Sequence, residues 1–322
     1  MAKPKRGHED KMTRKEAERV AELYDLGEVK SWKYVSGGLI NYNFHIKTDK
    51  GDFIVRRLGY SLSNPYWKRQ KRLEYSLVSY LHKKDFPYMI PDFMKNNRGK
   101  YISSIGKDIF EVYPRIPGEK VKKLNDNQLK EVAKASAIFH RSVKGYSRWP
   151  KEDDSEWILT YYKKIRKLKP DSKVNRIARE NVDFFESILK RIISMDLNDD
   201  LVIGHKDMHT NNLLFDGDKL VGILDFENLG TVSRIHDISY ILDGMKPEKW
   251  DMFIKAYRKY GPLSKVEERK LLSFFLLERC NIFWWATLSM EKTPELKYKF
   301  IRHSVNYAKK LLKMAKKEKS WK

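Results

Sequence analysis

The chain has 322 residues, 41% hydrophobic and 13% aromatic, a composition that supports a sizeable core and excludes a disordered, charge-dominated chain. Its 66 Lys and Arg residues against 43 Asp and Glu residues give a formal net charge of +23, which attracts phosphates of any kind without selecting one. The single cysteine, Cys280, excludes an intramolecular disulfide and a cysteine-rich zinc site.

The first part of the chain has the pattern of a small β-rich lobe. A helical spacing of apolar and small residues over 14–26 ends at Gly27. The period then changes, and short segments rich in β-branched and aromatic residues alternate with turn residues, as in a meander of strands. A second helical spacing covers 68–82. The expected strands are 32–35, 43–48, 53–58, 101–105 and 108–113.

Pro114, Pro117 and Gly118 interrupt this pattern, and we expect a lobe boundary there. The predicted domains are 1–113 and 114–322. Beyond the boundary the spacing is mostly helical, with one β island over 201–224, so the layout predicts an α+β fold. The expected helices are 126–143, 156–167, 174–193, 247–260, 265–290 and 294–317.

The β island gathers groups suited to one kind of chemistry. Segments 213–215 and 220–224 predict a hairpin that returns Asp225 beside Asn212, with Asp207 shortly before them. Phosphoryl transfer needs a carboxylate that orients and accepts the proton of an attacking hydroxyl, and oxygen ligands that hold magnesium on nucleotide phosphates. Asp207 fits the first role, and Asn212 and Asp225 fit the second. In the alternative, structural interpretation, both aspartates are turn residues.

The spacing of these residues is that of the protein-kinase catalytic loop: His-x-Asp, an Asn five residues later, and an Asp-Phe pair after a hairpin. From Gly37 to about Tyr298, the sequence resembles the aminoglycoside phosphotransferase and choline kinase superfamily. The resemblance implies a bilobal protein-kinase-like fold. A small antiparallel β lobe with one helix would bind the nucleotide, and a larger, mainly helical lobe would carry catalysis and substrate binding.

The resemblance also implies roles for the catalytic loop. Asp207 is the expected base and His205 the side chain that braces the loop, although a satisfied core histidine is the alternative. Asn212 and Asp225 are the expected magnesium ligands. His209 is expected to shape the loop, and Asp237 to cap it by accepting main-chain hydrogen bonds.

A small-residue turn between two expected strands is the candidate phosphate loop. Ser36, Gly37, Gly38 and Asn41 belong to it, and main-chain N–H groups in such a turn can approach phosphates closely. A bare Gly-Gly turn is weak evidence alone, and its position before the strand 43–48 strengthens it.

The resemblance implies further nucleotide contacts on the following elements. Arg56 is the expected cation for the α and β phosphates, held by Glu74 on the next helix. We prefer Arg56 to Arg57 because it alternates with Val55, a choice that a register shift of one residue would reverse. The strand 108–113 resembles the hinge strand, where the main chain of Glu111 and Val112 would contact adenine.

The acceptor is expected to be a small hydroxyl compound. A protein kinase needs a long activation segment that ends in Ala-Pro-Glu, whereas only residues 226–236 separate Asp225 from Asp237. Segment 113–119 resembles type II homoserine kinases, and Phe283-Trp284-Trp285 resembles choline and ethanolamine kinases. We therefore expect an amino alcohol such as choline, ethanolamine or homoserine; an aminoglycoside or sugar kinase of the same fold is the alternative.

Side chains on the late helix are the candidate acceptor contacts. Glu278, Asn281 and Trp285 share one helix face, and a carboxylate beside an indole suits an amine-bearing alcohol. Glu227 is assigned to the same substrate. The alternative is that the tryptophans are plain core residues and Glu278 is solvated.

The expected cofactors are ATP or GTP and Mg²⁺, and the expected partner is the small-molecule substrate, with no obligatory nucleic acid. The polar N-terminus and the interrupted apolar stretch 274–290 predict a cytoplasmic protein without a membrane span. A second class stays open: a non-catalytic, basic nucleotide- or nucleic-acid-binding protein on a kinase scaffold. The net charge and the lysine-rich tail 309–322 favour it, and the complete set of catalytic residue types disfavours it.

Overall fold

The computed structural model describes residues 11–35, 41–150, 155–195, 197, 200–290 and 292–317. The chain forms two compact units. Unit 1 comprises Met1–Glu131 and Met208–Leu229, and unit 2 comprises Val132–Asp207 and Gly230–Lys322. The α+β fold, with an antiparallel sheet in the N-terminal region and mostly helices beyond it, is confirmed. The functional boundary expected between residues 113 and 114 stays a prediction, because compactness does not test lobe function.

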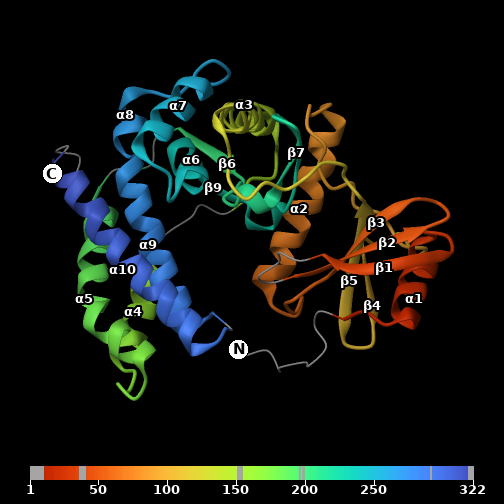
Figure 1. The fold of residues 1–322 in the computed structure, drawn as a ribbon, viewed down its shortest axis with the longest axis horizontal. Coiled ribbons are helices and arrows are strands. Elements are labelled where there is room, and N and C mark those ends of the chain that lie inside the picture. The colour runs from red at the N-terminus through yellow and green to blue at the C-terminus, as the bar shows by residue number, and fades with distance from the viewer. Residues whose placement is uncertain are drawn as a thin grey trace. The chain divides into compact units, whose positions relative to one another are not determined.

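The larger sheet of unit 1 is antiparallel, with the strand order β1-β2-β3-β5-β4 (Figure 1). Alternating apolar and polar residues form its strands, as a sheet covered on one face requires. The register places Arg56 of β3 between Asn43 on β2 and Glu111 on β5. The strands are β1 (Val29–Val35), β2 (Tyr42–Thr48), β3 (Asp52–Arg57), β4 (Ile102–Ile105) and β5 (Asp108–Pro114).

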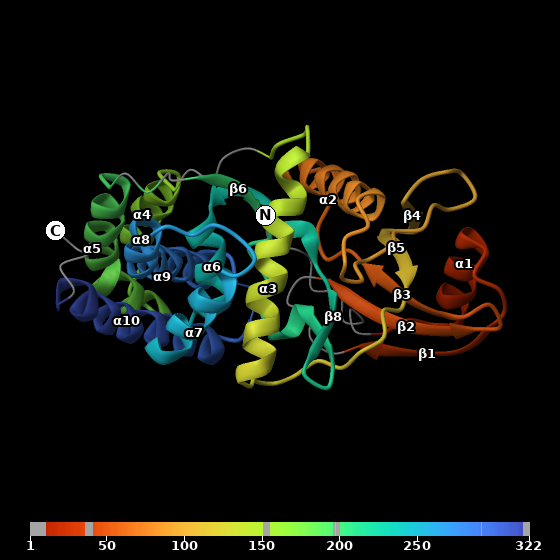
Figure 2. The same ribbon diagram turned by 90° about the horizontal axis from the view of Figure 1, so that it is seen from above.

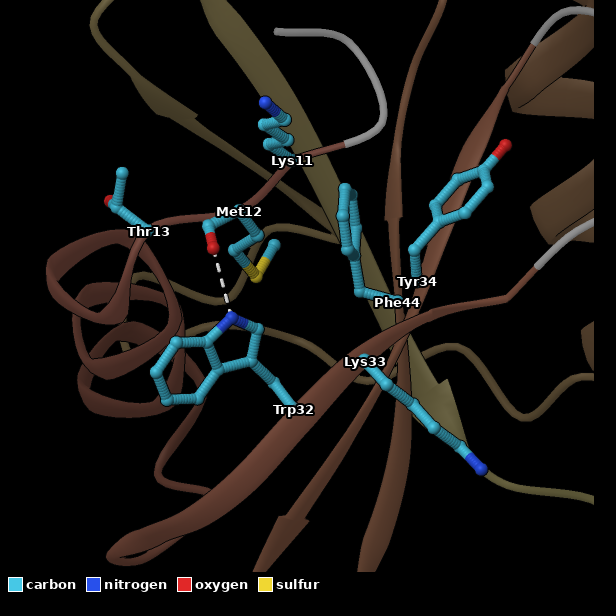
Figure 3. A pocket seen from close by; sticks show the side chains of 7 residues that line it. All are labelled: Lys11, Met12, Thr13, Trp32, Lys33, Tyr34 and Phe44. Atoms are coloured by element: carbon cyan, nitrogen blue, oxygen red, sulfur yellow. Dashed lines mark hydrogen bonds between the residues drawn. The ribbon is translucent and has the colours of Figure 1, made fainter.

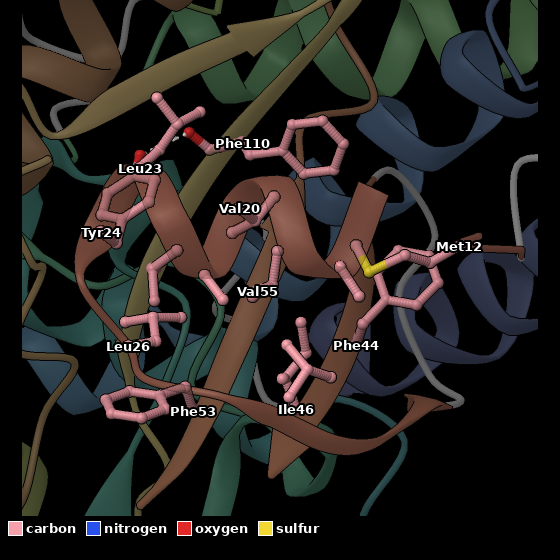
Figure 4. Packing of buried hydrophobic residues seen from close by; sticks show 14 residues of the cluster. Met12, Val20, Leu23, Tyr24, Leu26, Phe44, Ile46, Phe53, Val55 and Phe110 are labelled. Atoms are coloured by element: carbon pink, nitrogen blue, oxygen red, sulfur yellow. Dashed lines mark hydrogen bonds between the residues drawn. The ribbon is translucent and has the colours of Figure 1, made fainter. Parts of the chain in front are cut away.

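Helix α1 (Arg14–Tyr24) covers one face of this sheet (Figure 4). Thr13 and Glu16 form a reciprocal capping box at its start, which satisfies main-chain N–H groups that a helix leaves unpaired. The apolar face of α1 is buried on the sheet, and this burial is the main stabilising contribution of such a helix. The core cluster includes Ala17, Val20, Leu23, Tyr24, Leu26, Phe44, Ile46, Phe53, Val55 and Phe110.

The predicted hairpin is confirmed as β7 (Leu213–Asp216) and β8 (Lys219–Ile223), and it belongs to unit 1. Two loops of the unit bind it through main-chain pairs. Met89 donates to the Val221 carbonyl and accepts from Ile223 N, both at 2.9 Å. Glu119 forms a similar reciprocal pair with Phe215. Main-chain bonding therefore fixes the hairpin to the N-terminal region although about a hundred residues separate them in sequence.

Unit 2 is mainly helical, and α4, α5, α9 and α10 pack side by side in it (Figure 2). The expected helix over 265–290 is two helices, because Lys270 N bonds the carbonyl of Glu267 in a tighter turn between them. The sequence analysis missed α6 and the pairing of β6 (Leu201–Gly204) with β9 (Gly230–Ser233). The helices are α3 (Asp126–Ser142), α4 (Ile158–Arg166), α5 (Lys173–Ile193), α6 (Arg234–Leu242), α7 (Pro247–Tyr257), α8 (Lys265–Arg269), α9 (Leu271–Leu288) and α10 (Pro294–Lys317).

Among the helices of the described ranges, none combines the length and the apolar character that crossing a membrane requires.

Candidate active site

Arg56 lies at the centre of a buried charged cluster in unit 1. Its Nη1 atom is 3.3 Å from Glu111 Oε1, 3.5 Å from Asp225 Oδ1 and 3.8 Å from Glu74 Oε1. Its Nε atom donates to Asn43 Oδ1 at 3.2 Å. The predicted pair of Arg56 and Glu74 is therefore present, and a second carboxylate from the sheet lies closer to the guanidinium than Glu74 does.

The neighbouring Arg57 has a different environment. Its Nη1 atom donates to the Lys11 carbonyl at 3.0 Å, its Nη2 atom is 3.3 Å from Glu16 Oε1, and its guanidinium lies over the rings of Phe44 and Phe110. It belongs to the side of the sheet that α1 covers. The alternation of side chains along β3 thus separates the two arginines, and only Arg56 joins the acidic cluster.

Lys71, on α2 (Pro65–Lys83), was not identified by the sequence analysis. Its Nζ atom is 2.6 Å from Glu74 Oε2, 2.9 Å from Glu111 Oε1 and 3.9 Å from Glu227 Oε2. Gln70, Lys71 and Glu74 are all buried on one helix. Three polar residues at buried positions of one helix can indicate a functional cluster. The sequence alone does not show that these positions are buried, because the facing strand is distant in the chain.

The cluster contains more carboxylates than cations, and the pKa values reflect this. Burial raises the pKa of Glu74 to about 8, although Lys71 and Arg56 oppose the shift. Burial also acts to raise the pKa of Glu111, but the nearby Lys71 and Arg56 outweigh it and hold that pKa below its usual value. Burial and the charge of Asp225 raise the pKa of Glu227.

Asn212 and Asp225 meet at the end of the hairpin, as the sequence predicts. Leu224 N donates to the Asn212 carbonyl at 2.8 Å, which brings Asp225 next to Asn212. Asp225 has a left-handed backbone conformation (φ 67°, ψ 67°) at the start of the short helix Phe226–Asn228, and holding a non-glycine residue there requires support from its surroundings. Its side chain is 26% exposed, unlike the rest of the cluster.

In the described part of the chain, no group of three or more His, Cys, Asp or Glu side chains could hold a metal ion. Asn212 and Asp225 therefore provide only part of a coordination sphere. A divalent cation there would need further oxygen ligands, and nucleotide phosphates supply such ligands.

The structure does not support the predicted contact of Glu227 with the acceptor. The side chain is only 4% exposed, and its Oε2 atom accepts hydrogen bonds from Asn41 Nδ2 at 2.8 Å and Tyr60 OH at 2.9 Å. Glu227 thus ties the metal motif to residues that precede and follow the strands β2 and β3. Asn41 also accepts a hydrogen bond from Gly59 N. The predicted loop residues Ser36, Gly37 and Gly38 lie outside the described residues.

The main-chain groups of Glu111 and Val112 were predicted to contact adenine, and in the structure they lie within the sheet. Both residues lie inside the sheet and pair with β3. Met94 N donates to the Val112 carbonyl at 2.8 Å on the other side. The adenine contact of Glu111 and Val112 stays a prediction, and the sheet already engages main-chain groups in this part of β5. The contribution of Glu111 to the cluster is its side chain, whose Oε2 atom accepts from Tyr75 OH at 2.5 Å.

In unit 2, three buried side chains support the residues that precede Asp207. Asp237 Oδ1 accepts from Lys206 N at 2.6 Å, and Asp237 Oδ2 bonds His140 Nε2 at 2.9 Å. His140 Nδ1 bonds Tyr257 OH at 2.7 Å. Lys206 has a positive φ of 61°, and this bond stabilises the strained turn. The predicted cap by Asp237 is thus present in the geometry.

The pKa of Asp237 agrees with this arrangement. Burial acts to raise it, but the hydrogen bond from His140 and the Lys206 N–H together hold it below its usual value. A lasting negative charge on Asp237 strengthens its bond to the main chain. His205 is fully buried and lies edge-on to Phe139 at 6.2 Å between ring centroids, which fits a bracing side chain. Asp207 itself is half-buried.

The loop beyond Asp207 also contains a local histidine contact. His209 Nδ1 accepts from Asn211 N at 3.2 Å at the start of the short helix Thr210–Asn212. This capping contact agrees with the expected loop-shaping role of His209.

The candidate acceptor residues of α9 are only partly brought together. Glu278 Oε1 is 3.0 Å from His236 Nε2, and Asn281 Nδ2 donates to the same oxygen at 3.4 Å. Trp285 instead faces Phe300 of α10, 6.4 Å between ring centroids. Glu278 is 6% exposed, so the alternative that it is a solvated residue is wrong.

The sequence matches the model of the phosphotransferase enzyme family (APH) over residues 31–269, which is more than half of the chain. The chain belongs to this phosphotransferase family. The predicted superfamily, the kinase-like fold and the enzyme class, a small-molecule kinase, are thereby confirmed.

Individual relatives are more distant. A homoserine kinase of Pseudomonas aeruginosa (strain LESB58) is 22% identical over 279 residues, 82% of this chain and 83% of that protein. The solved structure of a microcompartment-associated aminopropanol kinase has a TM-score of 0.69 at 15% identity and covers 92% of this chain and 97% of that chain. A spectinomycin phosphotransferase in complex with ADP and spectinomycin has a TM-score of 0.67 at 16% identity, with 91% and 94% coverage. These two structures share the fold of this phosphotransferase.

A hollow of about 380 Å³ lies elsewhere on unit 1 of this phosphotransferase (Figure 3). In it, Trp32 Nε1 donates to the Met12 carbonyl at 2.8 Å, and the rings of Tyr34 and Phe44 meet edge-on at 5.7 Å. None of the predicted site residues lines it. It is separate from the charged cluster, and its lining is Lys11, Met12, Thr13, Trp32, Lys33, Tyr34 and Phe44.

We predict that Glu74 makes the folded phosphotransferase less stable as the pH rises through neutrality. The unfolded chain loses this proton near the ordinary value of 4.5, whereas the folded chain keeps it to about pH 8. The folded state therefore binds more protons in this window, and the free energy of unfolding falls as the pH rises through it. In the Glu74→Gln variant, the part of this pH dependence that comes from Glu74 disappears.

Urea denaturation at several pH values between about 5 and 8 measures the effect. The exposed Glu180→Gln on α5 is the control and should leave the wild-type pH dependence unchanged. An equal fall of stability with pH in wild type and Glu74→Gln would contradict the prediction.

Proposed function

We propose that this phosphotransferase moves the γ-phosphate of ATP or GTP to the hydroxyl group of a small amino alcohol. The observation that carries the proposal is the cluster in unit 1, where Arg56, paired with Glu74, lies 3.5 Å from Asp225. A phosphate-binding cation and a metal-binding carboxylate are thus neighbours, as nucleotide phosphates with a divalent cation require. Two relatives named above, a homoserine kinase and an aminopropanol kinase, act on amino alcohols, which supports the acceptor class.

The residues of the cluster fit a magnesium nucleotide. Arg56 and Lys71 provide two positive charges beside the carboxyl groups of Glu74, Glu111, Asp225 and Glu227, and the raised pKa of Glu74 keeps that group protonated near neutral pH. Asp225 is the most exposed member, and the bond from Leu224 N to the Asn212 carbonyl brings Asn212 near it. A carboxylate and an amide would together form a donor set suited to a hard cation. Bound there, magnesium would neutralise charge on the phosphates. Arg56 would bind the α and β phosphates, and the ADP in the spectinomycin phosphotransferase complex supports a nucleotide.

Asp207 is proposed to orient the acceptor hydroxyl and to accept its proton. The new bond forms between the acceptor oxygen and the γ-phosphorus, the bond from that phosphorus to the bridging oxygen breaks, and the nucleoside diphosphate leaves. The contacts of Asp237 with Lys206 and His140 support this role, because they fix the residue before Asp207 in a conformation that it would not adopt alone.

The acceptor amine is proposed to bind near Glu278. The carboxylate is held by His236 and Asn281, while the adjacent Arg279 is engaged by Asp243. The His236 ring, which holds this carboxylate, stacks on Phe274 at 4.5 Å between centroids and on Tyr240 at 5.3 Å. A buried carboxylate among rings favours an ammonium group through charge and cation–π attraction.

A panel of alcohols tests the proposed function directly. Homoserine, aminopropanol, ethanolamine, choline, a sugar and an aminoglycoside are each incubated with Mg²⁺ and ATP or GTP, and nucleoside diphosphate release is measured. Phosphorylation of an amino alcohol is expected. Preferred phosphorylation of the sugar or the aminoglycoside would reject the acceptor class, and binding of nucleic acid without any turnover would favour a non-catalytic protein.

Asp207→Asn should reduce turnover by about 100-fold or more, since it removes the base and keeps the size of the side chain. The affinity for the nucleotide should stay near wild type. Steady-state kinetics with the best acceptor of the panel, together with calorimetric titration of ADP, separates the two effects. Retained turnover would show that another group accepts the proton.

Asp225→Ala should abolish magnesium-dependent nucleotide binding as well as catalysis, because Glu227 is already bound by Asn41 and Tyr60 and cannot replace the lost ligand. Calorimetry with ADP in the presence and absence of Mg²⁺ measures it. Equal magnesium-supported binding in wild type and variant would remove Asp225 from the metal site.

Glu278→Gln and Trp285→Leu should each raise KM for the acceptor severalfold and leave KM for the nucleotide unchanged. The first removes the charge proposed to hold the amine, and the second removes the indole that the sequence predicts on the same helix face. Phe300→Leu is the control for Trp285, because it alters the packing of the same indole from the α10 side. An unaltered acceptor KM in both variants would place the amine elsewhere.

A further inference from the structure

We propose that Lys71 is a positioning residue that holds Arg56 and Asp225 ready for the magnesium nucleotide. The inference rests on the proposed function and adds a residue to it. The carrying observation is that Lys71 contacts Glu74, Glu111 and Glu227 at once.

The ion pairs form a continuous chain of contacts that begins at Asp225 and ends at Glu227. Asp225 pairs with Arg56, and Arg56 pairs with Glu74 and Glu111. The same two glutamates pair with Lys71, and Lys71 reaches Glu227, two residues beyond Asp225. The short segment 225–227 is therefore held at both ends by the two cations.

The shared glutamates explain why two cations are needed. With Lys71 present, Glu111 Oε1 lies 2.9 Å from Lys71 Nζ and 3.3 Å from Arg56 Nη1. The two cations therefore share the electrostatic attraction of one carboxylate oxygen. Without Lys71, Arg56 would be the one cation of the cluster left to pair with Glu74 and Glu111. Coulomb attraction inside the unit would then draw the guanidinium away from Asp225 and the phosphates.

Moving the charged ammonium group of Lys71 out of water is energetically unfavourable, which indicates a role beyond packing. Both Lys71 and Glu111 are almost inaccessible to solvent, and moving charges out of water is unfavourable unless their partners are well placed. The Lys71 ammonium lies over the rings of Tyr75 and Phe93, each 5.7 Å to the centroid, and Tyr75 also bonds Glu111. The surroundings thus fix the position of the ammonium group.

The experiment compares Lys71→Met with the charge-matched double variant Lys71→Met/Glu111→Gln in the full chain. Calorimetry measures the Kd of Mg·ADP. We expect Lys71→Met to raise this Kd about tenfold or more, as loss of one partner of a buried charged pair does. The double variant restores the net charge of the cluster and should return the Kd to within about threefold of wild type, and KM for the acceptor should not change in either variant.

Arg57→Met is the matched control. Arg57 is a buried cation on the same sheet that lies over two aromatic rings, as Lys71 does, but it is outside the cluster. Its loss should lower the melting temperature and leave the Kd of Mg·ADP unchanged. Should Lys71→Met fail to fold, the double variant alone decides: a Kd near wild type supports the inference, and a Kd raised tenfold overturns it.

The outcomes separate the inference from the proposed function. If wild type binds Mg·ADP but Lys71→Met binds it equally well, or if Lys71→Met and Arg57→Met weaken it alike, the positioning role is overturned and the kinase proposal stands. If wild type does not bind Mg·ADP at all, both are overturned. If wild type binds Mg·ADP and phosphorylates nothing, the Kd pattern still decides the role of Lys71.

Discussion

The charge balance around Arg56 is the constraint on which unit 1 depends. A guanidinium that is to bind phosphates must stay charged and oriented while it is excluded from water, and burial alone makes this unfavourable. The chain meets the requirement with carboxylates from three separate elements: α2, β5 and the turn after β8. All three elements must be correctly placed for the cluster to form. The position of Arg56 therefore depends on the folding of the whole unit.

The same constraint accounts for the division of the chain into its units. The hairpin β7–β8 is separated from the sheet by the helices α3, α4 and α5, yet it belongs to unit 1. Its main-chain bonds to Met89 and Glu119 bring Asp225 within 3.5 Å of Arg56. The roles proposed for Arg56 and Asp225 require a fixed separation between the two side chains, and main-chain bonding within one compact unit provides it. Asp207, by contrast, belongs to unit 2, where Asp237 and His140 shape the turn before it.

Local patterns predicted much of this arrangement and failed where partners are distant. The hairpin, the pairing of Arg56 with Glu74 and the cap by Asp237 depend on spacing and strand alternation, which a single sequence contains. Lys71 could not be found in this way, because its three carboxylates come from positions 74, 111 and 227. The helix α6 and the strand β9 were missed because they are short and most of their own residues are buried, which weakens the alternation of polar and apolar residues.

Glu227 has surroundings that the sequence analysis did not predict. That analysis assigned Glu227 to the acceptor, whereas the left-handed backbone of Asp225 and the short helix that follows turn the side chain into the interior of unit 1. There it meets Asn41, Tyr60 and Lys71. A buried carboxylate with three partners cannot also bind an incoming amine without losing them. The proposed amine contact is therefore with Glu278 of unit 2, whose carboxylate is held by His236 and Asn281 rather than by groups of the charged cluster.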